Sequence, residues 1–297
     1  MSGRSFHGCG TALVTPFTAD GSLDEPALRA LVEWQIEEGI GFLVPCGSTG
    51  EAATLSFDEH VRVVEITAEQ ADGRVPVVAG SGSNDTAECI RLSRAVVVRG
   101  ATHLLVVSPY YNRPPQRGLI GHFEAVADAV DVPVLIYNIP GRTGSNMEAD
   151  TTLALAEHSG VIGIKEASAN LNQIIEVLLK RPDGFSVLSG DDALTVPIMA
   201  LGGEGVISVV SNAAPQAMSE LVAAMEQGDL ERARSLQAAL HGLMSVTLIE
   251  SNPIPIKAAL AELGRTTDRV RSPLTPLADA HRAAVSAALD SVPAGAQ

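Results

Sequence analysis

A lysine interrupts a short apolar run, SGVIGIKEAS, at residues 159–168. Lys165 could lie at a strand end, with its ammonium in water and its stem along apolar surface, as most lysines do. In a dry site, burial would instead disfavour the ammonium, lower the pKa and make the amine nucleophilic towards carbonyl groups. The residues that the fold brings beside Lys165 distinguish packing from chemistry.

The use of basic residues favours chemistry at this position. Of 20 basic residues only three are lysines, at 165, 180 and 257, and the others are arginines. Arginine cannot lose its proton near neutral pH, whereas lysine can. Lys257, in NPIPIKAAL, competes with Lys165, but it belongs to a C-terminal helical segment rather than to a strand end.

Other reactive side chains also follow apolar runs. Tyr137 lies near the end of VPVLIYN, and its phenol could pass protons during imine formation or simply be buried with one hydrogen bond. Ser48 and Thr49 lie in GSTGE, a turn that could present backbone N–H groups to a carboxylate or could cap a helix. Arg142 could clamp a carboxylate with its planar fork or remain an exposed loop residue.

Further polar candidates have simpler interpretations. Tyr110 and Tyr111 are adjacent, so at most one should face the local site and the other could serve an interface. Asp191 and Asp192 are more typical of a helix start than of a metal site. Cys46 has no histidine partner placed by the sequence, so a small buried residue is expected.

Eight Val-, Ile- and Leu-rich runs recur at the spacing of βα units. They cover residues 10–17, 41–47, 75–82, 103–109, 132–138, 161–166, 185–192 and 205–212. None alternates cleanly, as expected for parallel strands buried on both faces. The pattern predicts an α/β fold, a (β/α)8 TIM barrel. A doubly wound sheet is less favoured because no G-x-G-x-x-G follows the first run.

Helical patterns separate these runs. Residues 24–39 carry apolar positions at helical spacing and end at a glycine, and Ser56 with Glu59 forms a capping-box pattern that Asp85 and Glu88 repeat. After Gly228 only helical patterns follow. We therefore expect a catalytic barrel at 1–228 and a helical region at 229–297, ending in a disordered tail, SVPAGAQ.

Composition limits the possible partners and compartments. Hydrophobic residues make up 46% of 297 residues, and the formal net charge is -15. No basic cluster predicts binding to nucleic acid or to an anionic membrane. No signal peptide or membrane-spanning run is evident, and three cysteines are an odd number without metal-type spacing. We expect a reduced, cytoplasmic protein.

Catalytic residues of such barrels gather where the strands end. A lysine, a phenol, two hydroxyls and an arginine would then converge on one face. This set predicts a Schiff-base lyase or synthase that acts on a 2-keto acid. The protonated imine would serve as the electron sink, so no metal and no organic cofactor is expected.

The motifs GSTGE, SPYYNRP, YNIPGRTG, GIKEAS, LSGDD, GVISV and NPIPIK resemble, in this order, the dihydrodipicolinate synthase family. The similarity runs from about Gly8 to about Ala288. It implies condensation of pyruvate with L-aspartate 4-semialdehyde to 4-hydroxy-tetrahydrodipicolinate, in lysine and diaminopimelate biosynthesis. It also implies a homo-oligomer, usually a dimer of dimers.

The resemblance assigns roles to individual residues. Lys165 would form the Schiff base, Tyr137 would donate and accept protons, and Ser48 would complete a relay with Tyr111 from the neighbouring subunit. Substrates would be held by a second group of residues: Thr49, Arg142, Gly190 and Ile207. A lysine-binding regulatory site would include His60, Asn84, Glu88 and Tyr110.

Two departures from the family pattern have consequences. Ser48 replaces a common threonine and lacks the methyl group that stiffens χ1, so Ser48→Thr should leave turnover equal or better. Ala52 and Phe57 replace polar residues of lysine-sensitive members, so lysine inhibition should be weak or absent.

Two alternative functions remain on the same scaffold. One is N-acetylneuraminate lyase or a 2-keto-3-deoxy sugar-acid aldolase or dehydratase, against which Arg142 in GRTG and the YYNRP motif favour a short, carboxylate-bearing second substrate. The other is a non-catalytic barrel that only binds a keto acid.

Overall fold

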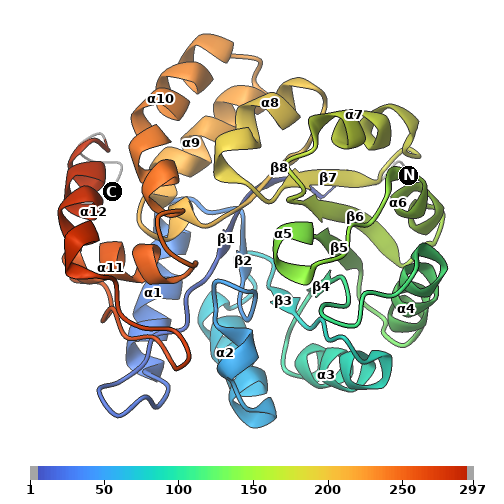
Figure 1. The fold of residues 1–297 in the computed structure, drawn as a ribbon, viewed down its shortest axis with the longest axis horizontal. Helices are drawn as coiled ribbons and strands as arrows, with labels where there is room; N and C mark the ends of the chain where they lie inside the picture. The colour runs from blue at the N-terminus through green and yellow to red at the C-terminus, as the bar shows by residue number, and fades with distance from the viewer. Residues whose placement is uncertain (1–5, 293–297) are drawn as a thin grey trace.

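Eight short parallel strands form the centre of the molecule, and helices surround them (Figure 1). The computed structural model describes residues 6–292. The strands are β1 (Gly8–Ala12), β2 (Phe42–Val44), β3 (Val78–Gly80), β4 (His103–Val107), β5 (Val134–Asn138), β6 (Val161–Glu166), β7 (Ser186–Ser189) and β8 (Gly205–Ser208). Seven of the apolar runs contain one strand each, and β1 overlaps the first run but begins two residues before it, so the predicted (β/α)8 barrel is confirmed.

The strands pair in the order β2-β1-β8-β7-β6-β5-β4-β3. A parallel bridge between Leu43 and Val77 joins the two ends of this order and nearly closes the barrel. In the β5–β6 register Tyr137 is the direct partner of Lys165. The register therefore puts the predicted phenol and the predicted amine on adjacent strands at the same height.

Apolar side chains fill the barrel and a second layer outside it. The interior group consists of Ala12, Phe42, Val44, Val78, Leu105, Leu135, Tyr137, Leu188 and Ile207. The opposite faces of the strands pack against the helices in a larger core. Burial on both faces explains why the runs did not alternate between apolar and polar residues.

The helices of the barrel lie in the segments that follow the strands. They are α1 (Glu25–Glu37), α2 (Phe57–Ala71), α3 (Thr86–Val98), α4 (Gln116–Asp128), α5 (Pro140–Thr143), α6 (Ala149–Ala156), α7 (Leu171–Lys180), α8 (Thr195–Ala200) and α9 (Pro215–Glu226), with 3-10 turns η1 (Ala52–Thr54), η2 (Asp192–Leu194) and η3 (Val210–Asn212). Ser56 and Glu59 form the full capping box of α2. Asp85 caps α3, but the Glu88 side chain bonds Ser83 instead, so that second box is only half formed.

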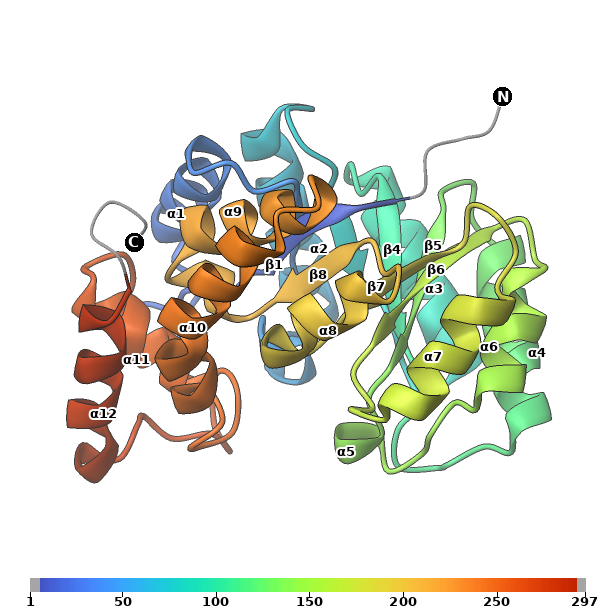
Figure 2. The same ribbon diagram turned by 90° about the horizontal axis from the view of Figure 1, so that it is seen from above.

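Three helices follow Gly228, as the sequence pattern predicts: α10 (Leu230–Val246), α11 (Ile254–Glu262) and α12 (Asp279–Asp290). Helix α10 packs along α9, and α11 packs against α12. Figures 1 and 2 both place α10–α12 together on the side of the barrel away from α4 and α6. Residues 293–297 of the predicted disordered tail lie outside the described part of the chain.

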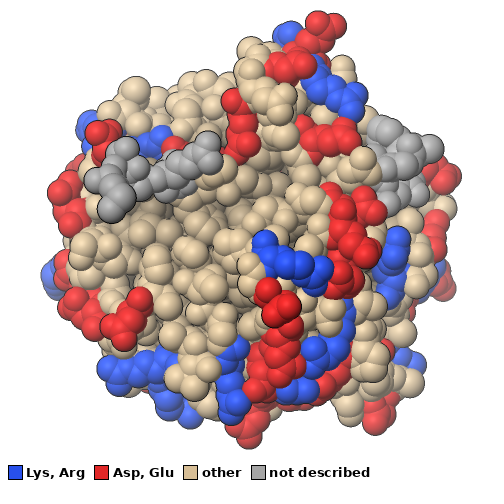
Figure 3. Space-filling view, turned by 180° about the vertical axis from the view of Figure 1, so that it is seen from behind, with Lys and Arg blue, Asp and Glu red and all other residues tan. Residues whose placement is uncertain are grey.

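Charged residues of both signs lie close to one another on the surface. On the face in Figure 3, lysines and arginines are interspersed with acidic residues around a broad uncharged area. Many charged residues of the described chain form ion pairs, such as Arg62 with Glu25 and Glu65, and Arg74 with Glu33. Among residues 6–292, no helix is both long and apolar enough to cross a membrane.

Candidate active site

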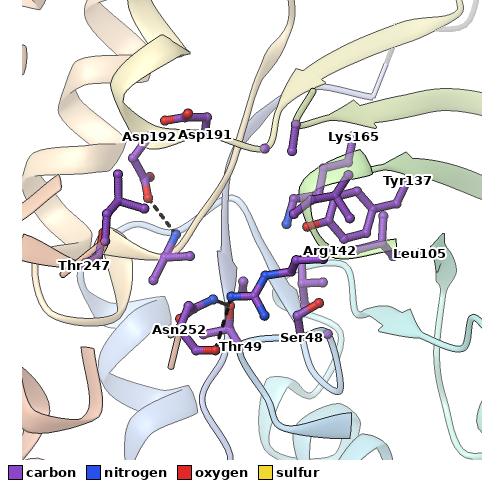
Figure 4. Close-up of a pocket in the computed structure, with 18 of the residues that line it drawn as sticks. Ser48, Thr49, Leu105, Tyr137, Arg142, Lys165, Asp191, Asp192, Thr247 and Asn252 are labelled. Atoms are coloured by element: carbon purple, nitrogen blue, oxygen red, sulfur yellow. Dashed lines mark hydrogen bonds between the residues drawn. The ribbon is translucent and has the colours of Figure 1, made fainter. Parts of the chain in front are cut away.

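Lys165 lies near the end of β6 and borders a cavity of about 180 Å³ (Figure 4). Its side chain is only 5% exposed. Burial lowers the pKa of Lys165 to about 8, the Asp192 carboxylate opposes that shift, and the Arg142 guanidinium reinforces it. The amine therefore lies in a dry environment, the second of the two possibilities left open by the sequence, and it borders a cavity.

Tyr137 lines the same cavity from β5. The Lys165 Nζ lies 4.4 Å from the centroid of the Tyr137 ring. Burial raises the pKa of the phenol, and a hydrogen bond with Ser48 acts in the opposite direction. The phenol is thus protonated at neutral pH and can donate a proton beside the amine.

The GSTGE segment forms a tight turn between β2 and η1 that lines the cavity with Ser48 and Thr49. Gly50 is required by close packing, since an added Cβ would lie 3.0 Å from both Cys46 N and Leu13 O. Thr15 Oγ1 donates to Gly50 O at 2.6 Å. The turn is therefore fixed by the barrel and presents two hydroxyls to the cavity.

Arg142 lies in the short helix α5 and also lines the cavity. Its Nη2 donates to Asn252 O at 3.3 Å, and Asn252 Nδ2 donates to Thr49 Oγ1 at 2.8 Å. Figure 4 shows the guanidinium reaching across the space between Tyr137 and Asn252. A cation is thus held at the cavity wall, where a carboxylate could bind.

Two further predicted residues contribute in different ways. Gly190 lines the cavity, and a Cβ there would lie 2.7 Å from Ala167 Cβ and 3.0 Å from Lys165 Cε. Glycine therefore makes room for the lysine stem. Ile207 is fully buried in the barrel interior, so its side chain packs below the cavity with Leu188 and Tyr137.

The two tyrosines of SPYYNRP occupy different environments. Tyr111 is 90% exposed with a left-handed φ of 72°, and it is not among the residues that line the cavities described here. Within one chain, it is therefore not brought to Lys165. Tyr110 borders a larger, adjoining cavity. The sequence-based expectation that the two side chains diverge agrees with this arrangement.

The adjoining cavity has a volume of about 560 Å³ and meets the first at Ser48, Tyr137 and Arg142. His60, Glu88 and Tyr110 line it, as do Ala52 and Phe57. Asn84 is attached to its wall, because its Nδ2 donates to Tyr110 O at 3.1 Å. The residues predicted to form a regulatory site therefore cluster, and their role stays a prediction.

The sequence analysis missed residues that come from the C-terminal region and from η2. Asn252, Met244, Thr247 and Leu248 line the smaller cavity. Asp192, expected only to begin a helix, also lines it, and its Oδ2 accepts from Val209 N and Val210 N. The NPIPIK motif contained the signal for Asn252, but only the fold brings it to the strand ends.

The remaining candidates have structural surroundings. Asp191 caps η2, as expected. Cys46 is buried, and burial raises the pKa of its thiol. Within residues 6–292, no group of three or more His, Cys, Asp and Glu side chains is arranged to hold a metal ion.

Known proteins resemble this chain in fold and in sequence along almost its whole length. The model of the dihydrodipicolinate synthetase family matches residues 5–292. A 4-hydroxy-tetrahydrodipicolinate synthase of Koribacter versatilis (strain Ellin345) is 52% identical over 277 residues, 93% of this chain and 92% of that protein.

Two solved structures have the same architecture. The dihydrodipicolinate synthase of Aquifex aeolicus matches with a TM-score of 0.94 and 43% identity, over 96% of this chain and 97% of that one. The chloride-inhibited dihydrodipicolinate synthase of Acinetobacter baumannii complexed with pyruvate matches with 0.94 and 42%, over 96% and 98%. The chain belongs to the dihydrodipicolinate synthetase family.

Proposed function

We propose that the protein is a synthase that condenses pyruvate with L-aspartate 4-semialdehyde through a Schiff base on Lys165, giving 4-hydroxy-tetrahydrodipicolinate. One observation carries this proposal: a buried lysine with a pKa of about 8 borders a cavity together with Tyr137, Ser48, Thr49 and Arg142. The names of the relatives and the pyruvate in the Acinetobacter baumannii structure support the same substrates.

The first half of the reaction needs an amine and a proton donor. Neutral Lys165 attacks the ketone carbon of pyruvate and forms a carbinolamine. Tyr137 donates a proton to the departing hydroxyl, which leaves as water, and an imine remains. The N–H groups and hydroxyls of the Ser48–Thr49 turn hold the pyruvate carboxylate.

The second half uses the imine as an electron sink. The protonated imine acidifies the adjacent methyl group, and the resulting enamine attacks the aldehyde carbon of the second substrate. Tyr137 and Ser48 move the protons, with Tyr111 of a neighbouring subunit as the third member of the relay. The amino group of the semialdehyde then displaces Lys165 and closes the ring.

Arg142 distinguishes this proposal from its closest alternative. Its guanidinium borders the same cavity as the reactive amine and suits the carboxylate of a short second substrate. A sugar-acid lyase would need hydroxyl-binding groups along a longer chain. Gly190 and Ile207 complete the substrate site in this proposal, through space for the lysine and through backbone contact.

Assembly, compartment and domain division belong to the same proposal. We infer a cytoplasmic dimer of dimers, because Tyr111 is exposed in the single chain and can reach another subunit. Residues 1–228 would form the catalytic barrel, and residues 229–297 a helical region that completes the site. Lysine would bind weakly at His60, Asn84, Glu88 and Tyr110, since Ala52 and Phe57 offer no hydrogen bonds.

Borohydride reduction in the presence of pyruvate, followed by peptide mass mapping, tests the mechanism. A pyruvyl adduct is expected on Lys165. An adduct on Lys180 or Lys257, or none, would overturn the proposal. A parallel assay should find condensation with L-aspartate 4-semialdehyde and no cleavage of N-acetylneuraminate. The reverse result would favour N-acetylneuraminate lyase as the function.

A further inference from the structure

Glu51, the last residue of GSTGE, adopts a backbone conformation that is unfavourable for glutamate. Its φ is 55° and its ψ is 36°, in the left-handed region. Glycine adopts this region readily, whereas a residue with a Cβ is strained there. Interactions of the Glu51 side chain must therefore stabilise the conformation.

Those interactions come from the C-terminal region. Glu51 Oε1 accepts a hydrogen bond from Lys257 Nζ, and its Oε2 accepts one from Arg271 N at 2.9 Å. The side chains of Glu51 and Lys257 are 1% and 0% exposed. A carboxylate in such a dry position needs a cation, because water cannot solvate it.

Lys257 is fixed equally well from its own side. Its Nζ also donates to Arg269 O at 2.7 Å and lies 4.3 Å from the centroid of the Phe17 ring. The amine is thus surrounded by a carboxylate, a carbonyl and an aromatic face. It does not line the cavity that contains Lys165, so it has no direct part in the chemistry.

The pair lies next to the active-site turn in the chain. Glu51 follows Gly50 directly, and Ser48 and Thr49 precede it. Lys257 follows Asn252 by five residues, and Asn252 Nδ2 donates to Thr49 Oγ1. The C-terminal region therefore contacts the turn at two points. One is the Asn252–Thr49 hydrogen bond at the smaller cavity, and the other is the Glu51–Lys257 ion pair, which lies outside that cavity.

We propose that the Glu51–Lys257 ion pair positions the Ser48–Thr49–Gly50 turn for pyruvate binding, so that the C-terminal helical region sets the affinity for the keto acid. Glu51 and Lys257 are positioning residues, since neither touches the substrate in the proposed mechanism. This inference rests on the proposed function. The proposed positioning role differs from a purely stabilising role, because loss of the ion pair should affect the binding of one substrate, pyruvate, more than that of the other.

A single variant and a double variant separate the two roles. Glu51→Gln keeps the shape of the side chain and leaves the Lys257 ammonium without its counter-ion. The double variant Glu51→Gln with Lys257→Met removes both charges, so much of the lost thermal stability should return. If the pair positions the turn, the KM for pyruvate stays raised about tenfold or more in both variants, because small displacements of binding groups are costly.

The KM for L-aspartate 4-semialdehyde provides the internal comparison. It should change much less, because Arg142 is held by Asn252 O rather than by Glu51. A matched control is Glu220→Gln with Arg232→Gln, which breaks another bridge between the C-terminal region and the barrel. That control should leave the pyruvate KM within about twofold of the wild type, as for a partly exposed pair.

The outcomes are distinct. If the pyruvate KM of the double variant returns to the wild-type value together with the melting temperature, the pair is only structural and the inference is wrong. An equal rise in both KM values would also overturn it. Should Glu51→Gln not fold, the double variant alone decides. A wild-type protein that forms no borohydride-trapped pyruvyl adduct would refute the proposed function itself, which is a different result.

Discussion

Lys165 and Lys257 have similar surroundings at first sight. Both are buried, and burial lowers the pKa of each to about 8. Each amine lies over an aromatic ring, at 4.4 Å from the Tyr137 centroid and 4.3 Å from the Phe17 centroid. By pKa alone, either could serve as a nucleophilic amine.

They differ in their hydrogen-bond partners and in their access to space. Lys257 Nζ donates hydrogen bonds to Glu51 Oε1 and to Arg269 O. These partners engage the ammonium and leave no space beside it for a substrate. Among the residues that the structure describes, Lys165 Nζ forms neither an ion pair nor a hydrogen bond with another side chain or backbone group, and it borders an open cavity. The charged form of Lys257 therefore stabilises the fold through its ion pair, whereas the neutral form of Lys165 is placed to attack a carbonyl group.

The comparison shows that a lowered pKa does not identify a catalytic lysine. Functional sites and structural ion pairs can both produce it. The additional requirements are a cavity beside the amine and a neighbouring group that can move protons, here Tyr137. The following experiments test whether the two lysines are separated in this way.

Replacement of the proposed Schiff-base lysine should have the largest effect. Lys165→Met should lower kcat/KM by about 10⁴-fold or more, as expected when a covalent nucleophile is removed. The melting temperature should not fall, because an apolar side chain suits the buried site. Substantial residual condensation in a pure sample would contradict the assignment.

Replacement of the paired lysine should affect stability first. Lys257→Met leaves Glu51 buried without a counter-ion and should lower the free energy of unfolding by about 3–5 kcal/mol. Urea titration measures this loss. At saturating pyruvate, the folded fraction should still form the adduct on Lys165, so a variant that is stable but cannot be trapped would assign Lys257 to the chemistry.

The pH dependence of borohydride trapping should reflect the ionisation of Lys165 alone. With a pKa of about 8, roughly one Lys165 in ten is neutral at pH 7, against about one in 3000 for an ordinary lysine. The rate of borohydride trapping should therefore rise nearly tenfold per unit below pH 8 and level off above it. Lys257→Met should give the same midpoint, and a shifted midpoint would mean that the two amines are coupled.

The smallest effect concerns the space beside Lys165. Gly190→Ala places a Cβ 3.0 Å from Lys165 Cε and 2.7 Å from Ala167 Cβ. Displacing the amine should lower kcat by about tenfold. Gly121→Ala is the matched control, because a Cβ there meets nothing within 4 Å. Equal activity of the two variants would mean that Lys165 adapts freely.

Much of this molecule could be predicted because its signals are local. The eight apolar runs, the capping box at Ser56 and the three helices after Gly228 depend on patterns within about 20 residues. The barrel topology then followed, since alternating strands and helices allow few arrangements. Lys165 and Tyr137 could be predicted to lie together because barrel strands end on one face, and both side chains line one cavity.

The contacts between distant segments were decided only by tertiary structure. Asn252 reaches Thr49 and Lys257 reaches Glu51 across separations of 203 and 206 residues. No periodicity encodes such pairs, because they depend on how the C-terminal helices pack against the barrel. The sequence alone determined that a lysine lies within an apolar run, near the end of the sixth strand. The packed structure determined which of two buried lysines is free to react, because only packing can supply one amine with a carboxylate and the other with a cavity.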